Sequence, residues 1–143
     1  MRAALGRRER QLFYLRLVSI GLILHQEIKV SESIVMKLLF LFDNTAIQAL
    51  DLIDRHCIAH IQSPSGRELY RIQRNNNEFF ICLKNSNFCT CPAFNFQVLR
   101  KRYILCKHML AVMLCRAMGL CKELQYSDET VTLMLLGDSS TST

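Results

Sequence analysis

The sequence predicts an α+β fold, in which a small antiparallel β-sheet is flanked by helices. Apolar residues recur at helical spacing in several separate runs, whereas a central stretch alternates short β-prone segments with turn-forming residues. A chain of 143 residues, half of them apolar, is long enough to bury one ordinary core. We therefore expect a single domain over residues 31–137, between a variable leader (residues 1–30) and a disordered tail (residues 138–143).

The leader combines arginines with an apolar run, as a secretory signal peptide does. Arginines are frequent in residues 1–16, and the apolar run extends from Leu12 to Leu24. However, Arg16 interrupts this run, and no small-x-small cleavage site follows it before Glu27. The run is also too short to span a bilayer of about 30 Å. We expect neither export nor a membrane anchor.

Two helices are expected at the start of the domain. Residues 31–42 place Ile34 and Leu38 on one helical face. Asp43-Asn44-Thr45 can end this helix and cap the next one, which we expect over residues 45–55.

Three strands joined by turns are expected next, over residues 57–62, 67–73 and 78–84. Ser63-Pro64-Ser65-Gly66 and Asn75-Asn76-Asn77 separate them, and these residue types favour turns because they tolerate or preset turn dihedrals. The third strand is apolar on both faces, so we expect it to be covered on both sides.

Further helices are expected on the C-terminal side of the sheet. Residues 92–99 can form one or two helical turns. Residues 104–118 are strongly helix-like, and Gly119 can end that helix in a left-handed conformation. Ser127 is placed to cap a last helix, which ends at Gly137.

A C-x-C … C-x-H pattern follows the third strand and consists of Cys89, Cys91, Cys106 and His108. Three thiolates and one imidazole make the ligand set of a closed tetrahedral zinc site. Residues two apart in an extended strand point to the same side, so Cys89 and Cys91 can face one ion. Residues two apart in a helix lie roughly 200° apart, so Cys106 and His108 should lie where a loop enters a helix. The pattern predicts one structural zinc ion in a zinc finger of about residues 79–120.

The surroundings of this pattern are basic. Residues 79–122 hold seven basic residues and no acidic one. Three thiolates outweigh the dication by about one charge, and nearby basic side chains can offset that charge and keep the thiols deprotonated. The alternative interpretation is a phosphate-facing patch, whose candidate residues are Arg100, Lys101, Arg102 and Lys107.

Catalysis at this zinc ion is not expected, and the sequence does not predict an enzyme. Catalytic zinc sites keep an open position and usually have three protein ligands with a carboxylate base nearby. Here four protein ligands close the shell, and no acidic residue occurs between Glu78 and Glu123. The H-x-E and P-C-x-x-C elements of zinc deaminases are absent as well.

Other cysteines and histidines have simpler interpretations. His56 and His60 are four residues apart, but the segment between them lies in a predicted strand, so we expect surface or hydrogen-bonded histidines there. Cys82 is expected in the core, and Cys115 is expected to be a core thiol or to support the metal ligands without being one. Seven cysteines, an odd number, favour a reducing compartment over a secreted disulfide framework.

The metal-ligand pattern resembles the SWIM zinc finger, whose signature is C-x-C, a variable gap, and C-x-H. The fragment from Cys106 to Ala111 matches the longer C-x-H-x-x-A form, which is typical of the SWIM subunit of the Shu complex. Further matches are ALDLIDR at residues 49–55, SPSGR at 63–67, CPAF at 91–94 and VLRK at 98–101. The resemblance extends from about Leu38 to about Leu136.

This resemblance implies a function in DNA repair. SWIM subunits of the Shu complex form an obligate heterodimer with a RecA-like recombinase paralogue, and the pair promotes assembly of recombinase filaments in homologous recombination and meiosis. The resemblance implies a nuclear protein, in which the four residues of the pattern bind zinc and Ala111 lets the following helix pack closely. It is also compatible with a weak contact to single-stranded DNA. The alternative is a stand-alone zinc finger that binds nucleic acid directly through its basic loop.

Overall fold

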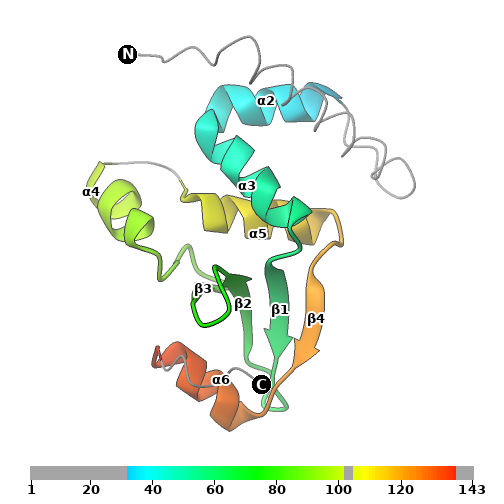
Figure 1. Ribbon diagram of the computed structural model, residues 1–143, viewed down its shortest axis with the longest axis vertical. Helices are drawn as coiled ribbons and strands as arrows, with labels where there is room; N and C mark the ends of the chain where they lie inside the picture. The colour runs from blue at the N-terminus through cyan, green and yellow to red at the C-terminus, as the bar shows by residue number, and fades with distance from the viewer. Residues whose placement is uncertain (1–31, 102–104, 138–143) are drawn as a thin grey trace. The chain divides into compact units, whose positions relative to one another are not determined.

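A computed structural model describes residues 32–101 and 105–137 of the chain (Figure 1). The predicted leader (1–30), the predicted tail (138–143) and Arg102 lie outside the described residues. The chain divides into two units, residues 1–40 and residues 41–143. Helix α2 (Glu32–Phe42) carries the chain from the first unit into the second, and it occupies the first predicted helix. None of the described helices is long and apolar enough to cross a membrane.

The second unit is built around a four-stranded sheet in the order β3-β2-β1-β4. The strands are β1 (Ile58–Gln62), β2 (Glu68–Gln73), β3 (Phe79–Leu83) and β4 (Lys122–Gln125). The first three pair antiparallel, as predicted. Gly66 has a φ of 82°, which glycine adopts without steric cost, and this lets the chain turn between β1 and β2.

The fourth strand corrects the prediction of a purely antiparallel sheet. β4 pairs with β1 in parallel, with His60 opposite Glu123, so the sheet is mixed. The α+β class itself is confirmed. The segment of β4 is short, largely exposed and charged, so it lacks the apolar alternation that marks a strand in the sequence. Its strand conformation depends on its position beside β1, which only the long-range fold provides.

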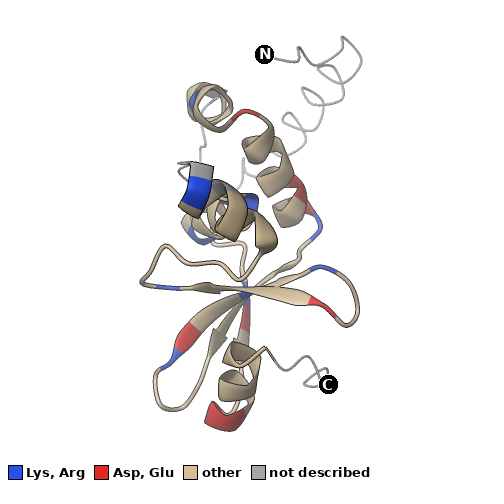
Figure 2. Ribbon diagram, turned by 90° about the vertical axis from the view of Figure 1, so that its left-hand side faces the viewer, with Lys and Arg blue, Asp and Glu red and all other residues tan. Residues whose placement is uncertain are grey.

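The two faces of the sheet are covered by different helices. Alternating strand residues Ile61, Leu69 and Ile81 form one buried cluster with Val131 and Met134 of α6 (Asp128–Leu135). Residues of the opposite parity face α5 (Lys107–Ala117), as the ring contact between Phe80 and His108 indicates. Figure 2 shows the sheet nearly edge-on, with α6 near the C-terminus on one side of it.

Helix α3 (Asn44–Asp54) packs against α5 and forms the outer layer on this side of the sheet (Figure 1). Its buried residues include Ala46 and Ala49, which are 1% and 0% exposed. Small side chains at such a position let two helices approach closely. The predicted helix at residues 45–55 is therefore confirmed, with a start one residue earlier.

The chain between β3 and α5 is partly helical, as predicted for residues 92–99. It contains a short π-helix, η1 (Phe94–Val98), followed by α4 (Leu99–Lys101). Helix α5 begins at Lys107 and not at residue 104, because Cys106 has an extended backbone (φ −83°, ψ 164°) and caps the helix. The helix ends at Ala117, and Gly119 follows in the left-handed conformation expected of a C-terminal stop.

Helix α6 begins at the predicted cap. The Ser127 hydroxyl accepts a hydrogen bond of 3.2 Å from the backbone N–H of Thr130. Replacing Ser127 with alanine removes this acceptor, and we expect a loss of about 1 kcal/mol in the free energy of unfolding. Urea unfolding of the zinc-loaded protein measures the loss. Ser127→Gly should cost only a few tenths of that amount, and an equal cost for both variants would contradict the capping role.

Candidate metal centre

The structure brings together the four predicted metal-ligating residues from two segments of the chain. Cys89 pairs with β3 in an isolated antiparallel bridge, so its backbone is extended as the C-x-C spacing requires. Cys91 lies at the entrance of the helical turn, where its sulfur accepts a hydrogen bond of 3.2 Å from the Phe94 N–H. Cys106 caps α5, and His108 lies in the first turn of that helix. The second pair therefore lies at the expected junction of loop and helix.

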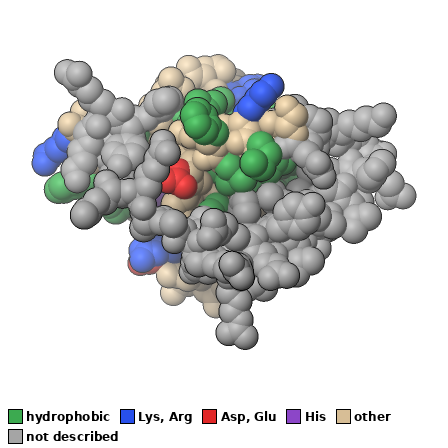
Figure 3. All heavy atoms as spheres, turned by 90° about the horizontal axis from the view of Figure 1, so that it is seen from above, with side chains coloured by type: hydrophobic (Ala, Val, Ile, Leu, Met, Phe, Trp, Pro, Cys, Tyr) green, Lys and Arg blue, Asp and Glu red, His purple; other side chains and the backbone are tan. Residues whose placement is uncertain are grey.

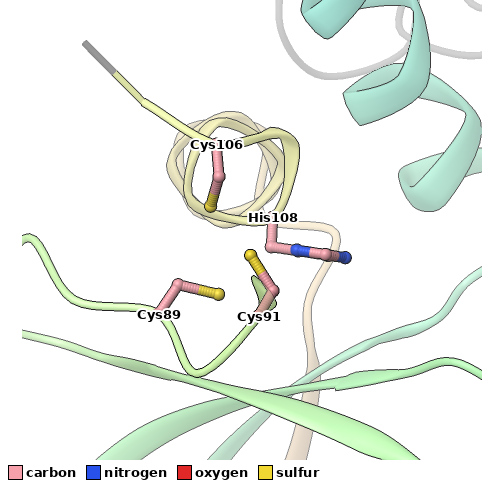
Figure 4. Close-up of side chains that lie close together, drawn as sticks. All are labelled: Cys89, Cys91, Cys106 and His108. Carbon is pink, nitrogen blue, oxygen red and sulfur yellow. The ribbon is translucent and has the colours of Figure 1, made fainter. Parts of the chain in front are cut away.

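The donor atoms of Cys89, Cys91, Cys106 and His108 lie within 4.8 Å of one another, and all four residues are buried. Figure 4 shows the thiols of Cys89 and Cys91 approaching from the loop and that of Cys106 from the start of α5. A tetrahedral zinc ion with Zn–S bonds of about 2.3 Å holds its sulfur ligands about 3.8 Å apart. The cluster therefore has the composition and the dimensions to bind one zinc ion.

The ionisation of the three thiols is linked, because they share one small space. Hydrogen bonding with Cys106 and Cys89 holds the pKa of Cys91 well below its usual range. Hydrogen bonding with Cys89 and Cys91, together with burial, raises the pKa of Cys106. A hydrogen bond with Cys106 lowers the pKa of Cys89. Hydrogen bonds with Cys82 and Cys91, together with burial, have the larger combined effect, so the pKa of Cys89 is raised. Without a cation the cluster favours a single thiolate, and a dication supplies the charge that holds three.

One ring nitrogen of His108, Nδ1, is buried without a hydrogen-bond partner among the described residues. A buried nitrogen without a hydrogen-bond partner costs free energy of folding. A metal ion bound by the imidazole would supply a partner for it. The Phe80 ring lies 4.7 Å from the imidazole, and the buried Phe94 ring is covered edge-on by Phe88 at 5.6 Å. The contact with Phe80 helps to shield the buried imidazole of His108 from water.

Neither of the two predicted basic residues whose side chains are described belongs to the metal cluster. Arg100 is exposed, and its guanidinium lies 5.2 Å from the centre of the exposed Phe96 ring. Lys107 is half-buried at the first position of α5, next to Cys106. The side chain of Lys101 is outside the description, as is Arg102. A nucleic-acid contact through these residues stays a prediction.

The other histidines and cysteines occupy positions that the sequence predicts in part. His60 is buried in β1, where its Nδ1 lies 2.7 Å from the Glu123 carboxylate and its ring stacks on Tyr70. Its hydrogen bond confirms the simple interpretation, and His56 lies outside the strand. Cys115 is buried in α5, outside the metal cluster.

Sequence reasoning placed Cys82 in the core but missed its contact with the cluster. Cys82 is buried, and the isolated bridge places it directly opposite Cys89. The alternation of β3 indicates which face carries Cys82. The register of Cys89 against β3 cannot be derived from that alternation, so no local signal could have revealed the contact.

Comparison with known proteins agrees with the geometry of the cluster. A family profile described as SWIM zinc finger matches residues 70–117, which include all four residues of the cluster. The chain is 45% identical to zinc finger SWIM domain-containing protein 7 of Homo sapiens over 109 residues, or 76% of this chain and 78% of that protein. No solved structure matches the chain significantly.

Relatives of the same name occur in other organisms. Zinc finger SWIM domain-containing protein 7 of Danio rerio is 40% identical, with 83% of this chain and 86% of the relative covered. The homolog from Dictyostelium discoideum is 30% identical, with 79% and 74% covered. With matches of this identity and coverage on either side of the buried Cys/His cluster, the chain belongs to the zinc finger SWIM domain-containing protein 7 family.

Proposed function

We propose that the protein is a zinc-stabilised adaptor subunit of a Shu-type complex, which promotes assembly of recombinase filaments in homologous recombination repair and meiosis. Its obligate partner is a RecA-like recombinase paralogue, and it acts in the nucleus. The observation that carries the proposal is the match to the SWIM finger across the four clustered residues, within a relationship that covers most of the chain. The wider resemblance described above supplies the complex and the process.

In this proposal Cys89, Cys91, Cys106 and His108 are the zinc ligands, and the zinc is structural. Four protein donors fill a tetrahedral shell and leave no position for a water molecule or a substrate. No carboxylate belongs to the group of possible ligands within the described residues. A hydrolytic zinc site requires both an open position and, in most cases, such a base. We therefore propose that the zinc ion has no catalytic role and that any ATPase activity of the complex belongs to the partner.

Exposed apolar side chains support a role in protein contacts. Large apolar residues at the surface of the second unit are Leu41, Phe88, Phe96, Leu99, Met113, Leu120, Leu135 and Leu136. Hydrophobic side chains also reach the surface on the face drawn in Figure 3. Singly exposed apolar residues are common in soluble domains, but aromatic residues, methionine and arginine are enriched at protein interfaces. An adaptor that folds as part of a heterodimer accounts for this surface.

Co-expression tests the adaptor role. The chain expressed alone should be poorly soluble, and co-expression with a RecA-like recombinase paralogue should yield a soluble one-to-one complex. The partner is identified by affinity purification of the tagged chain from cells and mass spectrometry, and a bacterial RecA serves as the control for specificity. A soluble, monodisperse chain that recovers no RecA-like protein would refute the proposal.

Direct binding to nucleic acid is the second candidate, because exposed Arg100 and Phe96 together present a charge and an aromatic ring. Three phosphate contacts would produce a slope of log K against log salt of only about −2 to −3. The double variant Arg100→Glu/Arg102→Glu separates the two candidates. An adaptor should retain its partner in this variant, whereas a stand-alone DNA-binding finger should lose its affinity for single-stranded DNA.

A further inference from the structure

Cys82 places a fifth thiol beside the metal centre. It lies on the edge strand β3, directly opposite Cys89, and both residues are 2% exposed. It does not belong to the group of four whose donor atoms lie within 4.8 Å of one another. Cys82 therefore contacts the centre through Cys89 and has no ligand role of its own.

The hydrogen bonds around this pair define its geometry. The Thr90 N–H donates to the Ile81 carbonyl at 3.0 Å, and the Leu83 N–H donates to the Phe88 carbonyl at 3.4 Å. These two bonds bracket Cys82 and Cys89, so the two cysteines form a non-hydrogen-bonded pair of an antiparallel ladder. Such pairs have Cα atoms about 4.5 Å apart and side chains on the same face. Disulfides require Cα separations of about 4.4–6.8 Å, so the backbone needs little movement to join these two sulfurs.

The register places Cys82 and Cys89 directly opposite each other, and both side chains are buried on the same face of the ladder. Cys82 is held in place because β3 pairs with β2 along its length, with Tyr70 opposite Cys82. Cys89 lies in the loop that leaves the sheet, so its backbone can move toward Cys82 more easily than the backbone of β3 can move toward Cys89.

We propose that Cys82 and Cys89 form an oxidative modification site, at which a hydroperoxide converts the zinc-bound centre into a disulfide and releases the metal. The proposal rests on the zinc-ligand role of Cys89 proposed above. The Cys89 thiolate attacks hydrogen peroxide, the O–O bond breaks, and a sulfenic acid and a hydroxide form; a proton from solvent converts the hydroxide into water. The Cys82 thiol then attacks the Cys89 sulfur, the S–O bond breaks, and a second water leaves with the thiol proton. One thiolate and one thiol are oxidised to the disulfide, one peroxide and one solvent proton give two waters, and zinc loses one of its four ligands.

Other thiol pairs provide the comparison. Cys89, Cys91 and Cys106 are also close to one another, but no strand register holds any two of them at a disulfide spacing. Cys115 and Cys121 form a separate pair, in which hydrogen bonding between the thiols lowers the pKa of Cys121. This second pair lies outside the metal cluster, so its oxidation should not release zinc.

The test treats the zinc-loaded full chain with hydrogen peroxide. A chromogenic chelator follows zinc release, and mass spectrometry of differentially alkylated peptides identifies the disulfide. We expect a Cys82–Cys89 disulfide with one zinc released for each disulfide, and dithiothreitol with added zinc should restore the original state. Cys82→Ala and Cys82→Ser should release zinc several-fold more slowly than the wild type. Cys115→Ala is the matched control, because Cys115 is equally buried at 2% exposed, and it should behave as the wild type does.

Two results would overturn the inference. One is a disulfide that joins Cys89 to Cys91 or Cys106 in the wild-type protein. The other is zinc release from both Cys82 variants at the wild-type rate. A wild-type chain that binds no zinc at all would instead refute the proposed ligand set, so failure of the inference and failure of the ligand assignment are distinguishable.

Discussion

Cys106→Ser should abolish the zinc-dependent fold of residues 85–120. The Cys106 sulfur is one of four clustered donors, and the same residue caps α5, where its sulfur accepts from the Met109 N–H at 3.5 Å. A structural zinc ion contributes about 10–16 kcal/mol of apparent binding free energy, which becomes folding free energy when no site exists in the unfolded chain. That amount is comparable with the whole stability of a typical domain, which is roughly 5–15 kcal/mol. Loss of the ion should therefore unfold residues 85–120.

Limited proteolysis with fragment mapping measures this effect. The variant should be cleaved within residues 85–120 under conditions in which the zinc-loaded wild type resists, and its zinc content should fall below one ion per chain. Removing zinc from the wild type with a chelator should reproduce the same cleavages. Cys115→Ala controls for the loss of a buried thiol from α5 and should keep its zinc. Unchanged protection of residues 85–120 from cleavage in Cys106→Ser would show that this segment folds without metal.

Ala111→Leu should destabilise the packing that supports the metal centre. Ala111 is 0% exposed on α5, the helix that packs against α3. Overfilling a well-packed site typically costs about 1–3 kcal/mol, because side chains and backbone must shift. Helix α5 also carries Cys106 at its cap and His108 in its first turn, so a displaced helix should bind zinc more weakly.

Urea unfolding of the zinc-loaded chain and competition with a chelator measure the two effects of Ala111→Leu. Met113→Leu is the matched control, because Met113 lies on the same helix but is 54% exposed. The control should change neither the free energy of unfolding nor the affinity for zinc. A wild-type free energy of unfolding in Ala111→Leu would mean that the surroundings of Ala111 have room for a larger side chain.

Local patterns predicted most of the helices and strands, because their signals lie within a few residues. The turn before β2 needs Gly66, and the cap of α6 needs a hydroxyl at Ser127, so the sequence itself marks both places. The start of α5 was predicted too early, although the requirement that Cys106 and His108 share one ion already places them at a helix entrance. The metal ligands were more informative there than helical periodicity.

The sequence by itself determined the ligand chemistry, the α+β class and the family, because these depend on residue types at short, fixed spacings. The tertiary structure alone decided three things: the parallel pairing of β4 with β1, the burial of His60 beside Glu123, and the contact of Cys82 with Cys89. Each of these joins segments through a long-range register. A register follows from how whole elements pack, and no residue-by-residue pattern in the chain specifies it.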